Sequence, residues 1–468
     1  MEAKKVNIIH YIICALFCFG FRFLPPVMGI TPLGMGILGT FIGAIYGWMT
    51  IDMLWPSLMA LAGIGWSIGM TQMLAASFGN LTVVVLIFCT PLFMMSAETG
   101  AFNWVIDKLL TSKAMAGKGF VTVWCLLLIA FFMGWNNPII MCLIFCGFVT
   151  SICKQVGIGK NEKFPVYMYI GIAFASMMGQ ILFPFFSTGL TLIMAYNAMF
   201  PNFPLDFVSY MLFILPMGVM MVTAYTLMMK FIFRVDVSKI SNFKSDGSSK
   251  VLTKDMKTSL FIFLFFIGLM LLTSLPLGPI SAFLNQFGLV GICFIMMGVL
   301  AVMKREDGVT PICDFNNLPV AWGQVLMVAF IMVIATYMNT PDTGISQAMA
   351  ALLMPFTQLP PIVFVVVALA FAAILTNVAN NMIVVVLVMP IMFNFASMVG
   401  LAPTGMIALL FLLAQFALAT PAASPVTAVA MTQEMADPSE MTKAALKVFP
   451  LLFIVALAIG WPFAQILF

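Results

Sequence analysis

Long apolar runs separated by short polar segments make up most of this chain. About 20 apolar residues in a helix span the hydrocarbon core of a bilayer, and shorter runs still reach across most of it. The pattern therefore predicts an all-α polytopic membrane protein with about eleven transmembrane helices. The predicted spans are residues 6–23, 31–51, 54–70, 80–97, 164–200, 207–233, 258–276, 285–303, 319–339, 404–433 and 445–468.

Two further apolar segments, 119–153 and 361–396, are interrupted in the middle by pairs of asparagines. Asn136 and Asn137 divide the first segment, and Asn380 and Asn381 divide the second. Each half has roughly 16 residues, which corresponds to about 24 Å of helix. That length reaches the bilayer midplane and turns back, so the pattern predicts two re-entrant helical hairpins with unwound tips.

The two halves of the chain resemble each other around these hairpins. Glu98–Asn137 aligns without a gap on Asp342–Asn381 when the sequence is shifted by 244 positions. At a shift of 237, Pro184–Ser187 aligns on Pro421–Ser424, and both segments interrupt a long apolar run. Two ordinary proline kinks would be the simpler reading of either segment alone. Because they lie at matched positions, we predict that both runs break into two half-helices.

Charge placement assigns the sides of the membrane. Only 8% of residues are charged, 63% are hydrophobic, and mean hydropathy is +1.14. With both hairpins returning to the side they enter, 19 of the 20 Lys and Arg fall on one side and only Arg22 on the other. Lys and Arg favour cytoplasmic loops, so we expect a cytoplasmic N-terminus, an external C-terminus and residence in a bacterial inner membrane. The bilayer is then a partner of the chain, and the halves form an inverted-topology repeat.

The pattern also divides the chain into scaffold and transport parts. Residues 98–118 and 342–360 are too polar for spans and are predicted to be amphipathic arms in the membrane interface. The predicted parts are 1–118 (scaffold spans and first arm), 119–234 (first hairpin, broken helix and following span), 235–257 (cytoplasmic loop), 258–360 (scaffold spans and second arm) and 361–468 (second hairpin, broken helix and last span).

The tips and breaks carry the candidate chemistry. N-terminal ends of half-helices attract anions, and carbonyl ends with Asn or Ser oxygens suit a hard cation such as sodium. A second half-helix is expected to begin at each tip and at each break, so four ends could converge on one site. The predicted substrate-binding residues are Asn136, Asn137, Ser187, Asn380, Asn381 and Ser424.

Several function classes are disfavoured by what the sequence lacks. No formally charged residue maps to the middle of a span, so proton coupling through a buried carboxylate is disfavoured. HExxH and P-loop motifs are absent from the sequence, so an enzyme is not expected. We likewise expect no organic cofactor and no nucleic-acid partner, but a small-molecule anion as the solute.

At these points the chain resembles the divalent anion:sodium symporter (DASS) family of the ion transporter superfamily. Leu375–Asn381 resembles that family's Ser-Asn-Thr hairpin tip, and Ala419–Thr427 resembles its second broken-helix segment. The resemblance implies eleven spans with two hairpins, an elevator movement, sodium as coupling ion and a homodimer. It also implies that Asn381 and Ser424 face the anion. The sodium ligands that it implies are Thr376, Ala379, Asn381, Ala423 and, in the first tip, Asn137.

The leading hypothesis is therefore a secondary transporter that couples sodium to a small organic anion of the di- or tricarboxylate kind. Three departures from the family pattern motivate an alternative. Pro138 and Met382 stand where the tips normally have threonine, and Phe186 stands where the first break has glycine. The alternative on the same fold is a sodium-independent anion exchanger or a carrier of a less charged solute. An alternative of another class is a passive channel.

Overall fold

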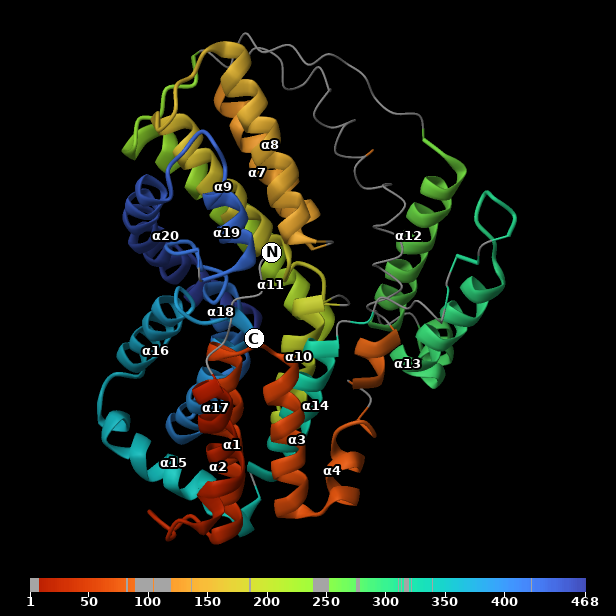
Figure 1. Cartoon of the computed structure of the whole chain (residues 1–468), viewed down its shortest axis with the longest axis vertical. Helices are drawn as coiled ribbons and strands as arrows, with labels where there is room; N and C mark the ends of the chain where they lie inside the picture. The colour runs from red at the N-terminus through yellow and green to blue at the C-terminus, as the bar shows by residue number, and fades with distance from the viewer. Residues whose placement is uncertain are drawn as a thin grey trace.

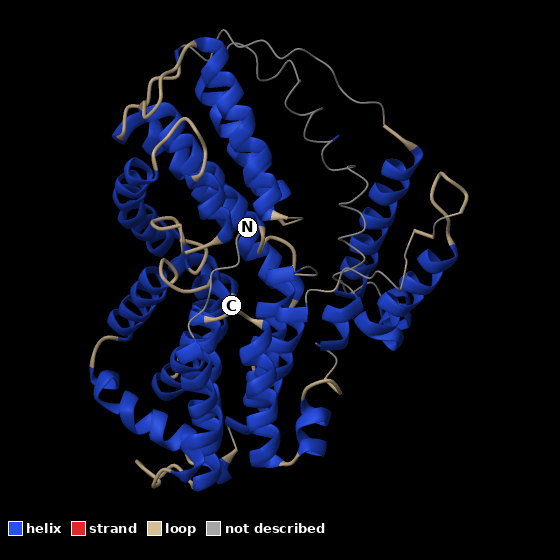
Figure 2. Cartoon of the chain, in the orientation of Figure 1, coloured by secondary structure: helices blue, strands red, loops and turns tan. Residues whose placement is uncertain are grey.

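The described parts of the chain are helical (Figures 1 and 2). Within the residues that the structure describes, one isolated bridge between Lys304 and Pro311 is the only strand-like pairing. This confirms the all-α class predicted from the apolar pattern. The computed structural model describes residues 8–80, 83–88, 104, 119–135, 137–184, 187–238, 252–274, 278–309, 311–312, 314, 320, 322–338, 340–421 and 423–468.

The N-terminal helices pack closely through glycines. A side chain at Gly39 would lie 2.0 Å from the Cβ of Phe21, and one at Gly63 would lie 2.7 Å from the carbonyl oxygen of Cys18. Small residues at such contacts let helix backbones approach one another in a membrane. Of the predicted span 80–97 the structure describes residues 80 and 83–88, and of the arm 98–118 it describes residue 104 alone. The helices are α1 (Ile8–Gly20), η1 (Phe21–Phe23), α2 (Pro32–Thr50), α3 (Leu54–Ile68) and α4 (Met70–Ala76).

Both predicted hairpins and both predicted helix breaks are present. Each hairpin consists of two consecutive helices separated by a few residues, and each break separates two half-helices. The hairpins are α7 (Gly119–Gly134) with α8 (Pro138–Val156), and α16 (Pro361–Leu375) with α17 (Asn381–Val399). The broken helices are α9 (Lys163–Gly179) with α10 (Ser187–Met199), and α18 (Pro403–Leu413) with α19 (Pro425–Met431).

The packing of these helices has the symmetry of an inverted repeat. Both α7 and α8 contact α9, as α16 and α17 contact α18. Each hairpin also reaches across to the other half, since α8 contacts α19 and α17 contacts α10. Figure 1 shows α7 and α8 in the upper part of the molecule and α16 and α17 below its middle. The hairpins and broken helices therefore interlock around the middle of the molecule.

The remaining helices complete the two halves. The sequence analysis did not anticipate the bend of α13, which turns by 83° at Gly288 (φ 61°, ψ 179°), near the start of the predicted span 285–303. Glycine adopts this backbone conformation without the steric cost that a Cβ would add. These helices are α11 (Phe207–Leu227) with the π-helical η3 (Met228–Ile232), α12 (Lys254–Ser274), α13 (Pro279–Val302), α14 (Trp322–Met338), η6 (Pro341–Thr343), α15 (Ile345–Leu353), η7 (Met354–Gln358) and α20 (Pro438–Leu467).

The number of membrane crossings stays a prediction. Among the described residues, five helices are long and apolar enough to cross a membrane, or six if the bent α13 is counted as one span. The five are α2, α8, α11 with η3, α17 and α20, so they include the second limb of each hairpin. The predicted total of eleven also relies on broken helices and on shorter apolar helices, which length alone does not identify as crossings.

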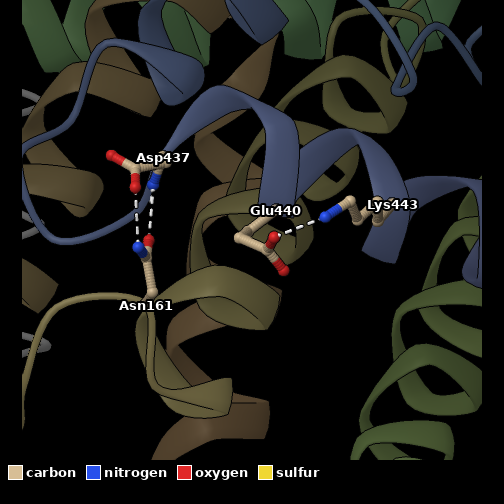
Figure 3. Close-up of polar contacts among 4 residues, drawn as sticks. All are labelled: Asn161, Asp437, Glu440 and Lys443. Atoms are coloured by element: carbon tan, nitrogen blue, oxygen red, sulfur yellow. Dashed lines mark hydrogen bonds and ion pairs between the residues drawn. The ribbon is translucent and has the colours of Figure 1, made fainter.

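Two contacts between loops are compatible with the side of the membrane predicted for each loop. Lys160 forms an ion pair of 2.6 Å with Asp437. Figure 3 shows the two hydrogen bonds of 2.7 Å that Asn161 exchanges with the same residue. At the opposite face, the hydroxyl of Thr31 donates to the carbonyl oxygen of Asp342 at 2.7 Å. Each contact joins loops that the sequence places on the same side.

Candidate solute-binding site at the second hairpin tip

The second hairpin turns at an unwound tip between Leu375 and Asn381. The helix α16 ends at Leu375, and the side chain of Asn380 caps the start of α17 by accepting a hydrogen bond of 2.9 Å from the main-chain N–H of Met382. Asparagine is favoured at this position because it satisfies a donor that the helix leaves free. Asn380, a predicted substrate ligand, therefore has a structural role as the N-cap that starts α17 after the tip.

Asn377 fastens this tip to the break after α18. Its side-chain nitrogen donates to the carbonyl oxygen of Phe416 at 3.1 Å, and its oxygen accepts from the N–H groups of Leu418 at 3.0 Å and Ala419 at 2.8 Å. The hydroxyl of Thr420 donates to the Asn377 carbonyl oxygen at 2.7 Å. Main-chain groups freed by a broken helix must find partners where water is excluded. Asn377 supplies them, a role that the sequence analysis did not assign.

Three oxygen atoms converge beside Asn377. The hydroxyl oxygen of Thr376 lies 2.8 Å from the side-chain oxygen of Asn381 and 2.7 Å from the carbonyl oxygen of Ala414. A hydroxyl has one proton and donates to one of these acceptors at a time. Thr376 is fully buried, Asn381 is 7% exposed, and the neighbouring Ala379 is 4% exposed. This oxygen-rich cluster has the hard, uncharged ligands that sodium or calcium coordinates.

A pair of glutamines joins the cluster to the first half of the chain. The side-chain oxygen of Gln415 accepts hydrogen bonds from the side-chain nitrogens of Asn381, at 3.1 Å, and of Gln180. Gln415 is fully buried after α18, and Gln180 is the C-cap of α9. Sequence reasoning missed both. The available signal was an amide within an apolar run shortly before each helix-breaking proline, Pro184 and Pro421.

The second break supplies the other predicted ligands. Ser424 is 7% exposed, and its hydroxyl oxygen accepts from the N–H of Val426 at 3.1 Å to cap α19. Ala423 is buried directly before it. The hydroxyl of Thr427 in α19 donates to the carbonyl oxygen of Ala417, so this hydrogen bond connects the two ends of the break. Ser424 and Ala423 thus lie in the same unwound segment that Asn377 holds.

The first hairpin tip is built in the same way but has fewer described contacts. Asn137 caps α8 by accepting a hydrogen bond of 3.1 Å from the N–H of Ile140. Among the described residues, no hydrogen bond joins the side chain of Asn137 to the Thr376–Asn381 cluster. Asn136 lies outside the described residues. Ser187 begins α10, as predicted from the break, but its side chain is not among those described.

The electrostatic field at this site comes from peptide and amide dipoles, because none of the side chains named here is charged. The N-terminus of α17 begins at Asn381 and that of α8 follows Asn137. Such helix ends have positive partial charge and stabilise an anion by about 0.3–1 kcal/mol each, and more when partly buried. At the second tip, the arrangement therefore offers cation ligands next to the anion-attracting N-terminus of α17.

Comparison with known proteins gives a family and a fold. The model of the family described as "Citrate transporter" matches residues 27–414, which include both hairpins and the first half of the second broken helix. A search of curated proteins found no match. Among solved structures, the fold is similar to that of the YdaH transporter of Alcanivorax borkumensis, with a TM-score of 0.59 and 13% sequence identity over 85% of this chain and 88% of that one.

Proposed function

The chain belongs to the citrate transporter family, and from this premise we propose that it moves a small organic anion across the membrane together with sodium. Membership in this family supports an integral membrane protein that transports anions, and we expect no enzymatic activity. The observation that carries the proposal is the convergence of the Thr376, Asn381 and Ala414 oxygens at the second hairpin tip. They offer a cation site beside a helix N-terminus that attracts an anion.

The binding of sodium and of the anion should be coupled, because the site contains no charged side chain to balance the charge of either one. A di- or tricarboxylate such as citrate, the solute in the family's name, loses much of its hydration when it enters a buried pocket. Helix ends at Asn381 and Asn137 and amide donors offset only part of this cost. A sodium ion at Thr376 and Asn381 would offset more of it, so each solute should bind more tightly when the other is present.

The movement that we propose is an elevator movement. Each hairpin packs against the first half of its own broken helix and the second half of the other one, which favours movement of α7–α10 and α16–α19 as one body. The helices α11 and α20, which contact each other, would move with them. In this proposal α1–α4 and α12–α14 form the scaffold, and two copies of the chain dimerise through it.

Uptake into proteoliposomes tests the proposal. Radiolabelled citrate and succinate are supplied to vesicles with an inward sodium gradient, or with potassium in its place. We expect at least one of them to accumulate only with sodium. Uptake that is the same with sodium and with potassium, but increases when the vesicles contain unlabelled anion, would contradict coupling to sodium. It would favour the sodium-independent anion exchanger. Flux that does not saturate with concentration would instead identify a channel.

A further inference from the structure

A cavity of about 410 Å³ lies between α12 and α13, on the opposite side of the molecule from α16 and α20 in Figure 1. Its volume falls in the range of small-molecule sites. We propose that it binds one acyl chain of an anionic phospholipid, whose phosphate lies against basic side chains at its mouth. Every residue that lines it is apolar: Phe261, Ile262, Phe265, Leu269, Phe283, Leu284, Phe287, Ile292, Ile295, Met296, Val299, Leu300 and Met303.

The cavity is open to its surroundings. Phe261 is 67% exposed and Phe265 is 47% exposed on α12, and Phe283 is 58% exposed on α13. The bend of α13 at Gly288 lies between the lining residues before it and those after it. In a bilayer the medium around these side chains is hydrocarbon, and an apolar cavity of this kind excludes water. An acyl chain therefore matches both the lining and the surroundings.

The register of α12 places a basic residue at the mouth. Lys257, Phe261, Phe265 and Leu269 are spaced four residues apart and therefore lie along one face of the helix. The last three line the cavity, and Lys257 is exposed one turn before them. A positive charge thus lies at the end of the apolar wall.

The other wall ends at the same mouth. Met303 lines the cavity, and the exposed Lys304 follows it directly. The main-chain N–H of Glu306 donates a hydrogen bond of 2.9 Å to the carboxylate of Asp255, which brings the end of α13 to the start of α12. Lys257 and Lys304 therefore flank one opening from two sides.

Charge at the mouth favours an anionic head group over a second copy of this chain. The start of α12 and the segment after α13 carry four basic and three acidic residues, and the carboxylates of Asp255 and Asp307 already accept hydrogen bonds from main-chain N–H groups. These residues are Lys254, Lys257, Lys304 and Arg305, with Asp255, Glu306 and Asp307. An apolar cavity next to a basic mouth complements an amphiphile with a negative head group. The sequence analysis places this mouth on the cytoplasmic side.

Fluorescence quenching in detergent tests the proposal. Phosphatidylglycerol brominated in one acyl chain is titrated into the full-length protein carrying Phe265→Trp. The matched control is Leu264→Trp, because Leu264 is adjacent and exposed but does not line the cavity. The signal of the eight native tryptophans is subtracted with the unmodified protein. We expect saturable quenching of Phe265→Trp alone, at a severalfold lower concentration than with brominated phosphatidylcholine.

Adding Lys257→Ala and Lys304→Ala to the Phe265→Trp variant should remove the preference for phosphatidylglycerol while quenching persists. Equal quenching of the Leu264→Trp control, or no preference between the two lipids, would overturn the proposal. So would a dimer, measured by light scattering, whose formation blocks quenching, because a second copy would then fill the cavity. If Phe265→Trp does not fold, Phe283→Trp on the opposite wall gives the same test.

Discussion

The side-chain nitrogen of Asn381 donates a hydrogen bond of 3.1 Å to the side-chain oxygen of Gln415. This bond joins the tip of the second hairpin to the break after α18. The same oxygen accepts from Gln180, so an ion that reoriented the amide of Asn381 would also change the hydrogen bonding of the first broken helix. Neutral amides thus connect the two halves of the chain where other transporters have intramembrane charges.

Asn381→Ala should abolish sodium-dependent uptake. The substitution removes one of the three converging oxygens and leaves the buried hydroxyl of Thr376 with one fewer partner. Loss of a buried hydrogen-bonding group costs about 1–3 kcal/mol, which is about a 5- to 150-fold loss of affinity for an ion held there. Uptake in proteoliposomes at several sodium concentrations measures it.

The control for this variant is Asn394→Ala on the same helix. Asn394 is half-buried, and its side chain donates to the carbonyl oxygen of Pro390 and to the sulfur of Met349, away from the tip. It should retain transport and its sodium dependence. Full activity in Asn381→Ala, with normal insertion in the membrane, would show that the site lies elsewhere.

The glutamine pair should be energetically coupled. Gln180→Ala and Gln415→Ala each remove one partner of a hydrogen bond between the two halves, and the double variant removes both. We expect the double variant to be less destabilised than the sum of the two single ones, by about 0.5–1.5 kcal/mol. Unfolding of the purified protein in detergent, followed for all four forms, gives this difference. Strict additivity would mean that the two side chains do not interact.

The hairpins and breaks were predictable because their signals are local. Paired asparagines such as Asn380 and Asn381 interrupt an apolar run at the tip, and Pro421 stops a helix by removing a donor and clashing with the preceding turn. The repetition of both signals in the second half separated them from isolated kinks. The packing of α8 on α19 and of α17 on α10 agrees with the predicted inverted repeat.

The contacts inside the site could not be predicted from the sequence, because they join residues that are far apart along the chain. Asn377 bonds main-chain groups about forty positions away, and only a folded chain shows which of those groups a broken helix leaves free. Gln180 and Gln415 lie 235 positions apart. The bend at Gly288 is also hidden, because a single glycine is often tolerated within a straight helix.

Gly134→Ala should destabilise the first hairpin. A methyl group at this position would lie 2.3 Å from the carbonyl oxygen of Ser176, which belongs to the backbone of α9 and has little freedom to move. Overpacking of this kind costs about 1–3 kcal/mol. The matched control is Gly147→Ala on α8, where nothing lies within 4 Å. Thermal unfolding should show a lower midpoint for Gly134→Ala only, and equal midpoints would contradict the close packing of α7 on α9.

The contact between the 157–162 and 432–437 loops should weaken in acid. The Lys160 ammonium, followed by the amide of Asn161, lowers the pKa of the Asp437 carboxyl from its usual value. A carboxyl with a lowered pKa in the folded state stabilises that state fully above its unfolded pKa of about 4. This stabilisation is lost as the pH falls through the folded pKa. Asp437→Asn should therefore lower the midpoint of thermal unfolding at pH 7 and have a smaller effect near pH 3.

Glu440→Gln is the comparison for this variant. Glu440 pairs with Lys443 within α20, as Figure 3 shows, and does not join the two loops. Its substitution should leave the unfolding midpoint at pH 7 nearly unchanged, because an exposed pair within one helix contributes about 0.3–0.5 kcal/mol. An Asp437→Asn variant that matches Glu440→Gln at every pH would show that the loop contact does not stabilise the fold. A difference that disappears in acid would instead identify the ionised Asp437 carboxylate as the group that joins the end of the first hairpin to the start of α20.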